Sequence, residues 1–222
     1  MAYAVLNYWK TAASAAALLA CIISPSASAR ADQSPLALAC NRNPSLTAYT
    51  FDMNVVLAMR HFPWLHFRLA GAGQNVRGEH YMVHFTKTPF FARGMNEVDL
   101  STLDPRMWRN RYIVDLVDQK NSLTTFSLRP RDQDQQTNSL TNALVTLDAN
   151  YATRTVVLQY ANGGSITLNL TPENTYGYWL PAAGEAQIHM PGEVLTAHAS
   201  FSNYVIESSQ AVEPGPTTNR WI

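Results

Sequence analysis

A long alternation of apolar and polar residues is the feature that most constrains this chain. Between Thr50 and Arg60 every second residue is a large apolar one, namely Phe51, Met53, Val55, Leu57 and Met59. The residues between them are polar or small, except for Val56. Because successive side chains of a strand point to opposite faces, this pattern predicts a strand with one face on an apolar interior and the other near water.

The same pattern returns twice directly afterwards. Residues 64–70 place Leu65, Phe67 and Leu69 on one face, and residues 79–86 place Tyr81, Val83 and Phe85 on one face. The glycines of Gly71-Ala72-Gly73 predict a flexible connection between these two strands. We therefore predict an antiparallel meander of three strands.

The remainder of the chain predicts shorter strands and one irregular crossing. Residues 89–107 lack a period of two, and Asp99 to Pro105 carries helix-cap and turn residues, which predicts a short helix or a loop across one mouth of the sheet. Asn162-Gly163 predicts a tight hairpin. Further strands are expected at 112–117, 122–128, 143–147, 154–160, 166–170, 176–180, 185–190 and 196–206. The predicted fold class is mainly β (α+β), with about eleven strands in a strongly curved antiparallel sheet or incomplete β-barrel whose concave face is covered by short helices.

The first residues have the organisation of an export signal. Lys10 precedes an uncharged run from Thr11 to Ile23, and Ala-x-Ala sites follow at 27–29 and 29–31. This order predicts a cleaved secretory signal over 1–31 and a periplasmic protein. An alternative is lipidation at Cys21, because Leu18-Leu19-Ala20-Cys21 resembles a bacterial lipobox, and the protein would then be anchored to a membrane. We expect one domain over 32–207 and a flexible tail over 208–222.

Charge and motifs exclude several function classes. Sixteen basic and sixteen acidic residues balance, which argues against nucleic acid as a partner. His80 and His84 would lie about 13 Å apart on an extended strand and so could not share a metal ion. No G-x-S-x-G motif is present, and caps and turns account for Asp99 and Asp104. We expect no catalytic residues, no metal and no cofactor; an enzyme remains the third hypothesis.

The order of elements resembles a known family. Four segments are similar to strands and hairpins of the periplasmic lipoprotein carriers and their relatives, the LolA/LolB/LppX-like family: Arg77 to Phe85 with Pro89 after it, Tyr160 to Ile166, Trp179-Leu180-Pro181, and Phe201 to Ile206. The resemblance implies an open half-barrel that binds lipoprotein acyl chains or another lipid. Arg60 and Arg68 are alternatives for the arginine that clamps a helix in such carriers.

These observations favour a non-catalytic binding protein of the cell envelope. Its expected ligand is a lipid or a lipoprotein acyl chain, which large apolar and flexible methionine side chains suit because recognition depends on buried area. The expected lining is Phe51, Met53, Val55, Leu57, Met59, Leu65, Phe67, Leu69, Tyr81, Val83 and Phe85. The alternative is an envelope-anchored structural or interaction protein with a filled core and a protein partner.

Overall fold

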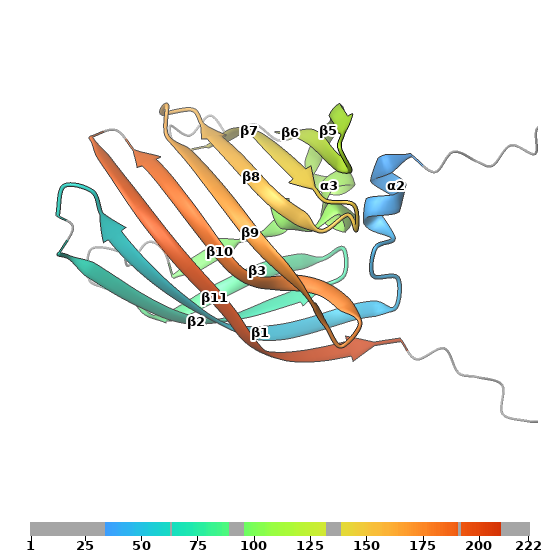
Figure 1. Ribbon diagram of the computed structural model, residues 1–222, viewed down its shortest axis with the longest axis horizontal. Helices are drawn as coiled ribbons and strands as arrows, with labels where there is room; N and C mark the ends of the chain where they lie inside the picture. Colours follow the sequence, from blue (N-terminus) through green and yellow to red (C-terminus); the bar gives the residue numbers. More distant parts are fainter. Residues whose placement is uncertain (1–33, 63, 89–95, 132–138, 191, 210–222) are drawn as a thin grey trace, which may run out of the picture. The chain divides into compact units, whose positions relative to one another are not determined.

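The computed structural model describes residues 34–62, 64–88, 96–131, 139–190 and 192–209. The described residues from Pro35 onward form one compact unit, in which eleven strands make a single antiparallel sheet (Figure 1). The elements are α2 (Pro35–Cys40), β1 (Leu46–Met59), β2 (His66–Val76), β3 (His80–Lys87), β4 (Glu97–Asp99), η2 (Ser101–Leu103, a 3₁₀ turn), α3 (Pro105–Arg111), β5 (Tyr112–Lys120), β6 (Leu123–Pro130), β7 (Leu140–Leu147), β8 (Thr153–Tyr160), β9 (Ser165–Thr175), β10 (Tyr178–Met190) and β11 (Glu193–Ser208).

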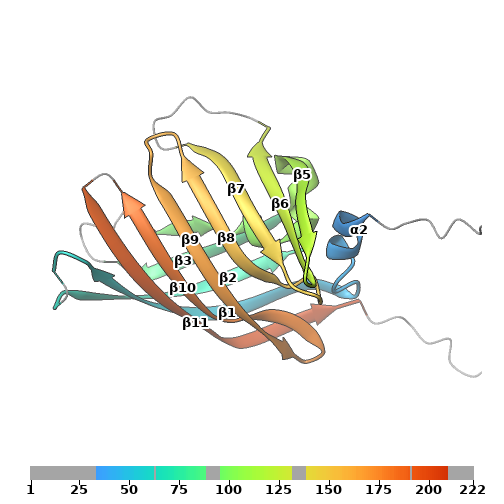
Figure 2. The ribbon, with the colours of Figure 1, turned by 45° about the horizontal axis from the view of Figure 1, so that its top comes forward.

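The strand order explains why the helices lie on one face. The order is β4-β3-β2-β1-β11-β10-β9-β8-β7-β6-β5, so the first and last strands are neighbours in the middle. β4 and β5 follow each other in the chain but are the two edges of the sheet. The segment 100–111 between them must cross from one edge to the other, and it carries η2 and α3. The sheet curves around this segment (Figure 2), whose buried side chains join the core. The predicted mainly β fold is confirmed.

β1 confirms the alternation at 50–60. Phe51, Val55 and Leu57 are buried, whereas Asp52 and Asn54 are exposed. The strand has neighbours on both sides, with Val55 opposite Leu69 on β2 and Ala199 on β11. An apolar row therefore runs along the concave side of this interior strand.

The prediction of a flexible connection at Gly71-Ala72-Gly73 is wrong. Both glycines lie inside β2, opposite β1 and β3. A Cβ on Gly73 would lie 2.0 Å from Cζ of Phe51, and one on Gly71 would lie 2.5 Å from the carbonyl oxygen of His84. Glycine inside a strand marks a close approach of another group. Here the missing side chains make room for an aromatic ring and for a neighbouring strand.

Two strand boundaries also differ from expectation. The strands expected at 176–180 and 185–190 form the single strand β10, which continues through an irregularity between Pro181 and Ala183. A proline within a sheet is tolerated at such an irregularity because its missing N–H is not needed there. Within the expected helix or loop at 89–107, residues 97–99 form the short edge strand β4, which pairs Val98 with Val83.

Two turns follow the residues that predicted them. Asp104 is the N-cap of α3, because its carboxylate accepts a hydrogen bond from the Arg106 N–H at 3.0 Å, and Pro105 occupies the first turn. The hairpin at Asn162-Gly163 forms, with a positive φ of 81° at Gly163. Among the described residues, no helix is long and apolar enough to cross a membrane. The expected leader over 1–31, which includes Cys21, and residues 210–222 of the expected tail lie outside the described residues.

Candidate functional site

The residues predicted to line a ligand lie together on the concave side of β1, β2 and β3. Register places Phe51 across from Gly73 and, beyond it, Val83; it places Met53 across from Gly71 and Phe85. Most of the predicted lining is buried: Phe51, Val55, Leu57, Leu69, Tyr81, Val83 and Phe85. Met53, Met59 and Phe67 are partly buried. Leu65 precedes β2 and is 40% exposed at the tip of the β1–β2 hairpin.

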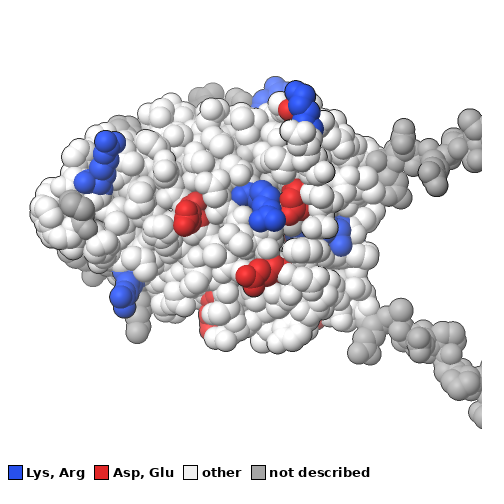
Figure 3. Space-filling model, viewed as in Figure 1, with Lys and Arg blue, Asp and Glu red and all other residues white. Residues whose placement is uncertain are grey.

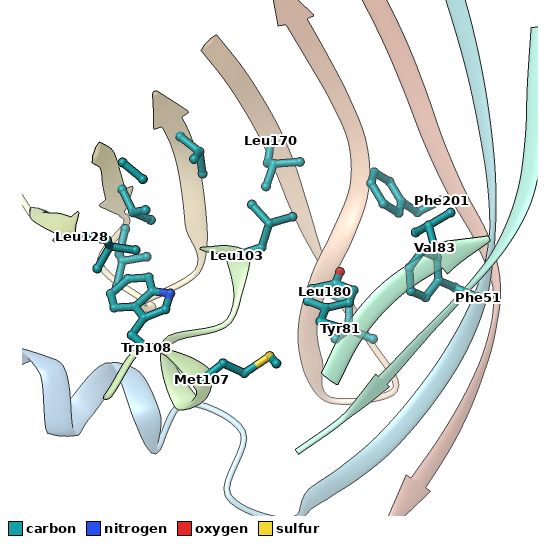
Figure 4. Close-up of a cluster of buried hydrophobic side chains, with 14 of the residues drawn as sticks. Phe51, Tyr81, Val83, Leu103, Met107, Trp108, Leu128, Leu170, Leu180 and Phe201 are labelled. Atoms are coloured by element: carbon teal, nitrogen blue, oxygen red, sulfur yellow. The ribbon is translucent and has the colours of Figure 1, made fainter. Parts of the chain in front are cut away.

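The other half of the concave face comes from strands that the predicted lining left out. Val156 on β8 is buried in the same core, and so are Leu170 on β9, Leu180 on β10 and Phe201 on β11 (Figure 4). Their signal was present in the sequence, since the expected strands at 154–160 and 166–170 also alternate. What could not be found locally is that β11 joins the two halves by pairing with β1.

Aromatic rings of β1, β3 and β11 fill part of the concave face. The ring of Phe51 lies 5.6 Å from that of Phe201, 5.7 Å from that of Tyr204 and 6.0 Å from that of Tyr81, measured between centroids. Tyr49 lies 5.9 Å from Tyr81. Tilted and edge-on ring pairs at such distances contribute attraction beyond their buried area.

The crossing segment covers this face and is fixed to the β6–β8 side. Trp108 of α3 is fully buried, 5.5 Å from Phe126 of β6 between ring centroids, and donates its indole N–H to the carbonyl oxygen of Thr102 at 3.0 Å. The hydroxyl of Thr153 on β8 donates to the carbonyl oxygen of Leu103 at 3.0 Å. Trp108 and Leu103 point into the same core as Leu128 and Leu170 (Figure 4).

A polar cluster fixes the same segment to β1 and β2, and we call Asn75, Asp104 and Arg106 the polar clamp. Asp104 receives two short bonds from Arg106, from Nε at 2.9 Å and from Nη2 at 2.7 Å, and one from Nδ2 of Asn75 at 3.0 Å. Arg106 also donates to Oδ1 of Asn75 at 3.1 Å and to the carbonyl oxygen of Leu46 at 3.1 Å. Asn75 is fully buried on β2. Three bonds thus tether α3 to the two strands.

The clamp keeps a buried carboxylate ionised. Burial by itself raises the pKa of Asp104, but the hydrogen bonds and positive charge of Arg106, together with the Asn75 amide, outweigh burial and hold that pKa below its usual value. Burial likewise lowers the pKa of Arg106, and Asp104 more than restores it. Removing one partner of such a buried ion pair strongly destabilises the protein, because the other charge is left buried without compensation.

The clamping arginine is not one of the two that the sequence suggested. Arg60 lies at the end of β1 and Arg68 on the outer face of β2, and both are exposed. Arg106 does the clamping from the helix itself. The cap sequence Asp104-Pro105-Arg106 was its only local signal, because Asn75 lies 29 residues away.

Two cavities border the concave face. Near α2, a cavity of about 20 Å³ is lined by Arg42, Tyr49, Tyr81 and Asp104, among others. Burial raises the pKa of both Tyr49 and Tyr81, whose side chains interact with each other, and the Tyr81 hydroxyl has no other hydrogen-bond partner among the described residues. This volume suits one water molecule and is far too small for an acyl chain.

The second cavity lies at the opposite end of the strands. A groove of about 240 Å³ is lined by Tyr160, Asn162, Gly164, Ser165, Ile166, Ile188, His189 and Met190. Ile166 and Ile188 are directly paired in the sheet and face the same side as Leu170. We call this the rim groove. Its apolar lining and its place at the end of the concave face make it the described cavity best suited to an apolar ligand.

The titratable side chains that meet inside the fold are those around the polar clamp, namely Arg42, Tyr49, Tyr81, Asp104 and Arg106, where Asp104 is already paired with Arg106. Within the part of the chain that the structure describes, no three His, Cys, Asp or Glu residues are grouped to hold a metal ion. His84 is exposed and lies 3.0 Å from Glu97, and Asp99 pairs with Arg111 at 2.5 Å on the surface. Asp115 pairs with Arg129 at 3.0 Å, also on the surface.

Comparison with known proteins gives a structural relationship only. No family model matches the sequence, and no curated protein matches it. A LolA superfamily protein from Nitrosomonas europaea superposes with a TM-score of 0.56 at 11% identity, covering 79% of this chain and 93% of that one. A domain described as an outer membrane lipoprotein-sorting protein from Vibrio parahaemolyticus gives 0.53 at 13% identity, covering 81% and 94%.

A third neighbour is a DUF1329 family protein from Desulfovibrio piger, with a TM-score of 0.53 at 9% identity, covering 78% of this chain and 91% of that one. All three alignments span nearly the whole neighbour, so the likeness includes both halves of the sheet and is not confined to one meander. At this level of identity the likeness concerns the fold alone. The chain has a LolA-like fold.

Proposed function

We propose that this chain is an exported, non-catalytic carrier that holds a lipid or a lipoprotein acyl chain against the concave face. The observation that carries the proposal is the apolar concave face, which ends in the rim groove beside Ile166 and Ile188. The LolA-like fold supports it, since one neighbour is described as an outer membrane lipoprotein-sorting protein.

The two ends of the concave face would have different roles. Between the crossing segment and the sheet the space is filled by Phe51, Tyr81, Trp108 and their neighbours, so an acyl chain has no room there while the crossing segment is in place. At the rim groove, apolar side chains are only partly buried. An acyl chain would enter at the groove and reach further only if α3 moves away from β1 and β2.

The way in which the crossing segment is attached to the sheet would allow α3 to move away from β1 and β2. On the β6–β8 side, α3 is attached by the burial of Trp108; on the β1–β2 side, three hydrogen bonds of the polar clamp hold it. A net hydrogen bond contributes about 1 kcal/mol, and one to a charged group about 2 kcal/mol. Binding an apolar ligand against newly exposed side chains could offset that loss, because about 25 cal/mol is gained for each Å² of apolar surface removed from water.

Lipid extraction of the purified protein tests the carrier proposal. We expect lipid in the extract, and saturable uptake of a fluorescent fatty acid by the delipidated protein. Ile188→Asn places an amide in the rim groove and should reduce uptake, whereas Ile113→Asn, at an exposed position on the edge strand β5, should not. A protein purified without lipid that takes up no fluorescent fatty acid would contradict the proposal.

Export to the periplasm is part of the same proposal and is supported by the organisation of residues 1–31. Cleavage after Ala29 or Ala31 would release a soluble carrier, and lipidation of Cys21 would anchor it. Expression in a bacterial host with labelled fatty acid, comparing the wild type with Cys21→Ser, separates the two. Label on the wild type alone supports anchoring, and an N-terminus at residue 30 or 32 supports cleavage.

A second candidate function is favoured by the edge strand β5. Its side chains are mostly exposed, including Leu116 at 50% and Val117 at 57%, and an exposed edge offers unpaired backbone groups to another strand. The chain would then be an interaction protein with a filled core. A lipid-free protein that loses a partner on Val117→Pro would favour this function over the carrier.

A further inference from the structure

The tip of the β1–β2 hairpin exposes two aromatic rings. Trp64 is 75% exposed and Phe62 is 46% exposed. Their centroids are 5.8 Å apart with the rings nearly perpendicular. Backbone hydrogen bonds hold the turn that carries them: the N–H of Phe62 donates to the carbonyl oxygen of Met59 at 3.2 Å, and the N–H of Leu65 donates to the carbonyl oxygen of Phe62 at 2.9 Å. We call residues Phe62, Trp64 and Leu65 the aromatic tip.

The surroundings of the aromatic tip are basic. Arg60 and Arg68 flank it and are exposed, and neither forms an ion pair with a described residue. The sequence from Met53 to Gly78 contains no aspartate or glutamate, although Glu193 lies in the neighbouring hairpin. In the face seen in Figure 3, basic side chains but no acidic ones are visible at the left-hand end, where the β1–β2 hairpin lies.

The aromatic tip belongs to the same end of the sheet as the rim groove. The N–H of Arg60 donates to the carbonyl oxygen of Val194 at 2.9 Å, which joins the tip to the β10–β11 hairpin. That hairpin begins at Met190, which is 49% exposed and lines the rim groove. Met190 of the β10–β11 hairpin thus lines the rim groove, and the aromatic tip lies on the adjacent β1–β2 hairpin.

Trp side chains with an apolar ring and one N–H donor are enriched at membrane–water interfaces. Arginines near an anionic lipid surface add electrostatic attraction. We propose that the aromatic tip docks this protein on the surface of a bilayer containing anionic phospholipid. Trp64 and Phe62 enter the headgroup region and Arg60 and Arg68 contact the headgroups. Docking there would bring the rim groove to the bilayer. The inference does not depend on the carrier proposal, because a protein can dock without extracting lipid.

Vesicle flotation with the purified protein tests the docking. The vesicles are phosphatidylcholine alone, or phosphatidylcholine with roughly one third phosphatidylglycerol. We expect binding at least about tenfold stronger to the anionic vesicles, with a decrease as salt is raised because salt screens exposed charges. The double variant Phe62→Ala with Trp64→Ala should lose about tenfold or more of this binding, and Arg60→Gln with Arg68→Gln should lose the preference for anionic lipid.

Tyr176→Ala is the matched control. Tyr176 is 79% exposed, follows β9 and precedes β10, and so lies at the opposite end of these strands from the aromatic tip. Its loss should leave vesicle binding unchanged. The inference is overturned if the wild type does not float with anionic vesicles, if Tyr176→Ala weakens binding as much as the tip variant does, or if the tip variant loses a protein partner while vesicle binding stays at the wild-type level.

Discussion

The ring of Phe51 fills the space that a side chain on Gly73 would need: its Cζ lies 2.0 Å from where a Cβ on residue 73 would be. Replacing an unstrained glycine by alanine ordinarily stabilises a protein, because it restricts the unfolded chain. Here Gly73→Ala should lower the free energy of unfolding by about 1–3 kcal/mol, since an extra methyl group forces a well-packed ring to move.

A double-mutant cycle separates the clash from other effects. Phe51→Leu alone should destabilise by leaving a cavity, but Gly73→Ala should cost less in the Phe51→Leu background than in the wild type. Urea unfolding monitored by circular dichroism measures all four proteins. If Gly73→Ala lowers the free energy of unfolding equally in both backgrounds, the ring of Phe51 is not the reason that residue 73 is a glycine.

The polar clamp predicts a steep loss of stability in acid. The pKa of Asp104 in the folded protein lies below its usual value, whereas in the unfolded chain it is about 3.9. The stabilisation from its ionised form is therefore complete well above pH 4 and is lost as the pH falls through the folded pKa. Asp104→Asn removes this contribution. We expect the wild type to lose more unfolding free energy between pH 7 and pH 3 than Asp104→Asn does, as measured by urea unfolding at each pH.

Arg106 should be the basic residue of α3 that matters most for stability. Arg106→Gln leaves Asp104 buried without its charge partner and should cost about 3 kcal/mol. Arg109 is exposed in the last turn of the same helix, so Arg109→Gln should change stability by less than about 0.5 kcal/mol. Hydrogen exchange should show faster opening of α3 in Arg106→Gln while β6 and β7 remain protected. Equal effects of the two substitutions would contradict the role given to the clamp.

The sequence predicts the strands of the sheet better than it predicts the contacts between them. The alternation at Phe51, Val55 and Leu57 is a local consequence of strand geometry, so it predicts β1 and its buried face without knowledge of a partner. Gly71 and Gly73 carry no such information, because a glycine in a loop and a glycine beneath a ring are identical in local sequence.

The sequence also predicts only part of the candidate site, because the rest depends on contacts between residues that are far apart in the chain. The cap residue Asp104 is recognisable beside Pro105, but its bond to Asn75 joins two positions brought together only by the crossing of 100–111 over the sheet. The rim groove likewise needs the pairing of Ile166 with Ile188, across a hairpin whose strand β10 continues through a proline that suggested a break. Local pattern predicts a buried face; long-range pairing decides which buried faces meet.

Truncation of two tryptophans of this chain should change its stability to very different extents. Trp108 is fully buried against Phe126, and its indole N–H is bonded to Thr102. Trp108→Ala should therefore cost about 3–5 kcal/mol in unfolding free energy, through lost burial and a large cavity beneath the crossing segment. Trp64 is 75% exposed, so Trp64→Ala should change that free energy by less than about 0.5 kcal/mol. Thermal unfolding checks both, and a large loss in Trp64→Ala would mean that the aromatic tip packs against the protein and is not free to meet a bilayer.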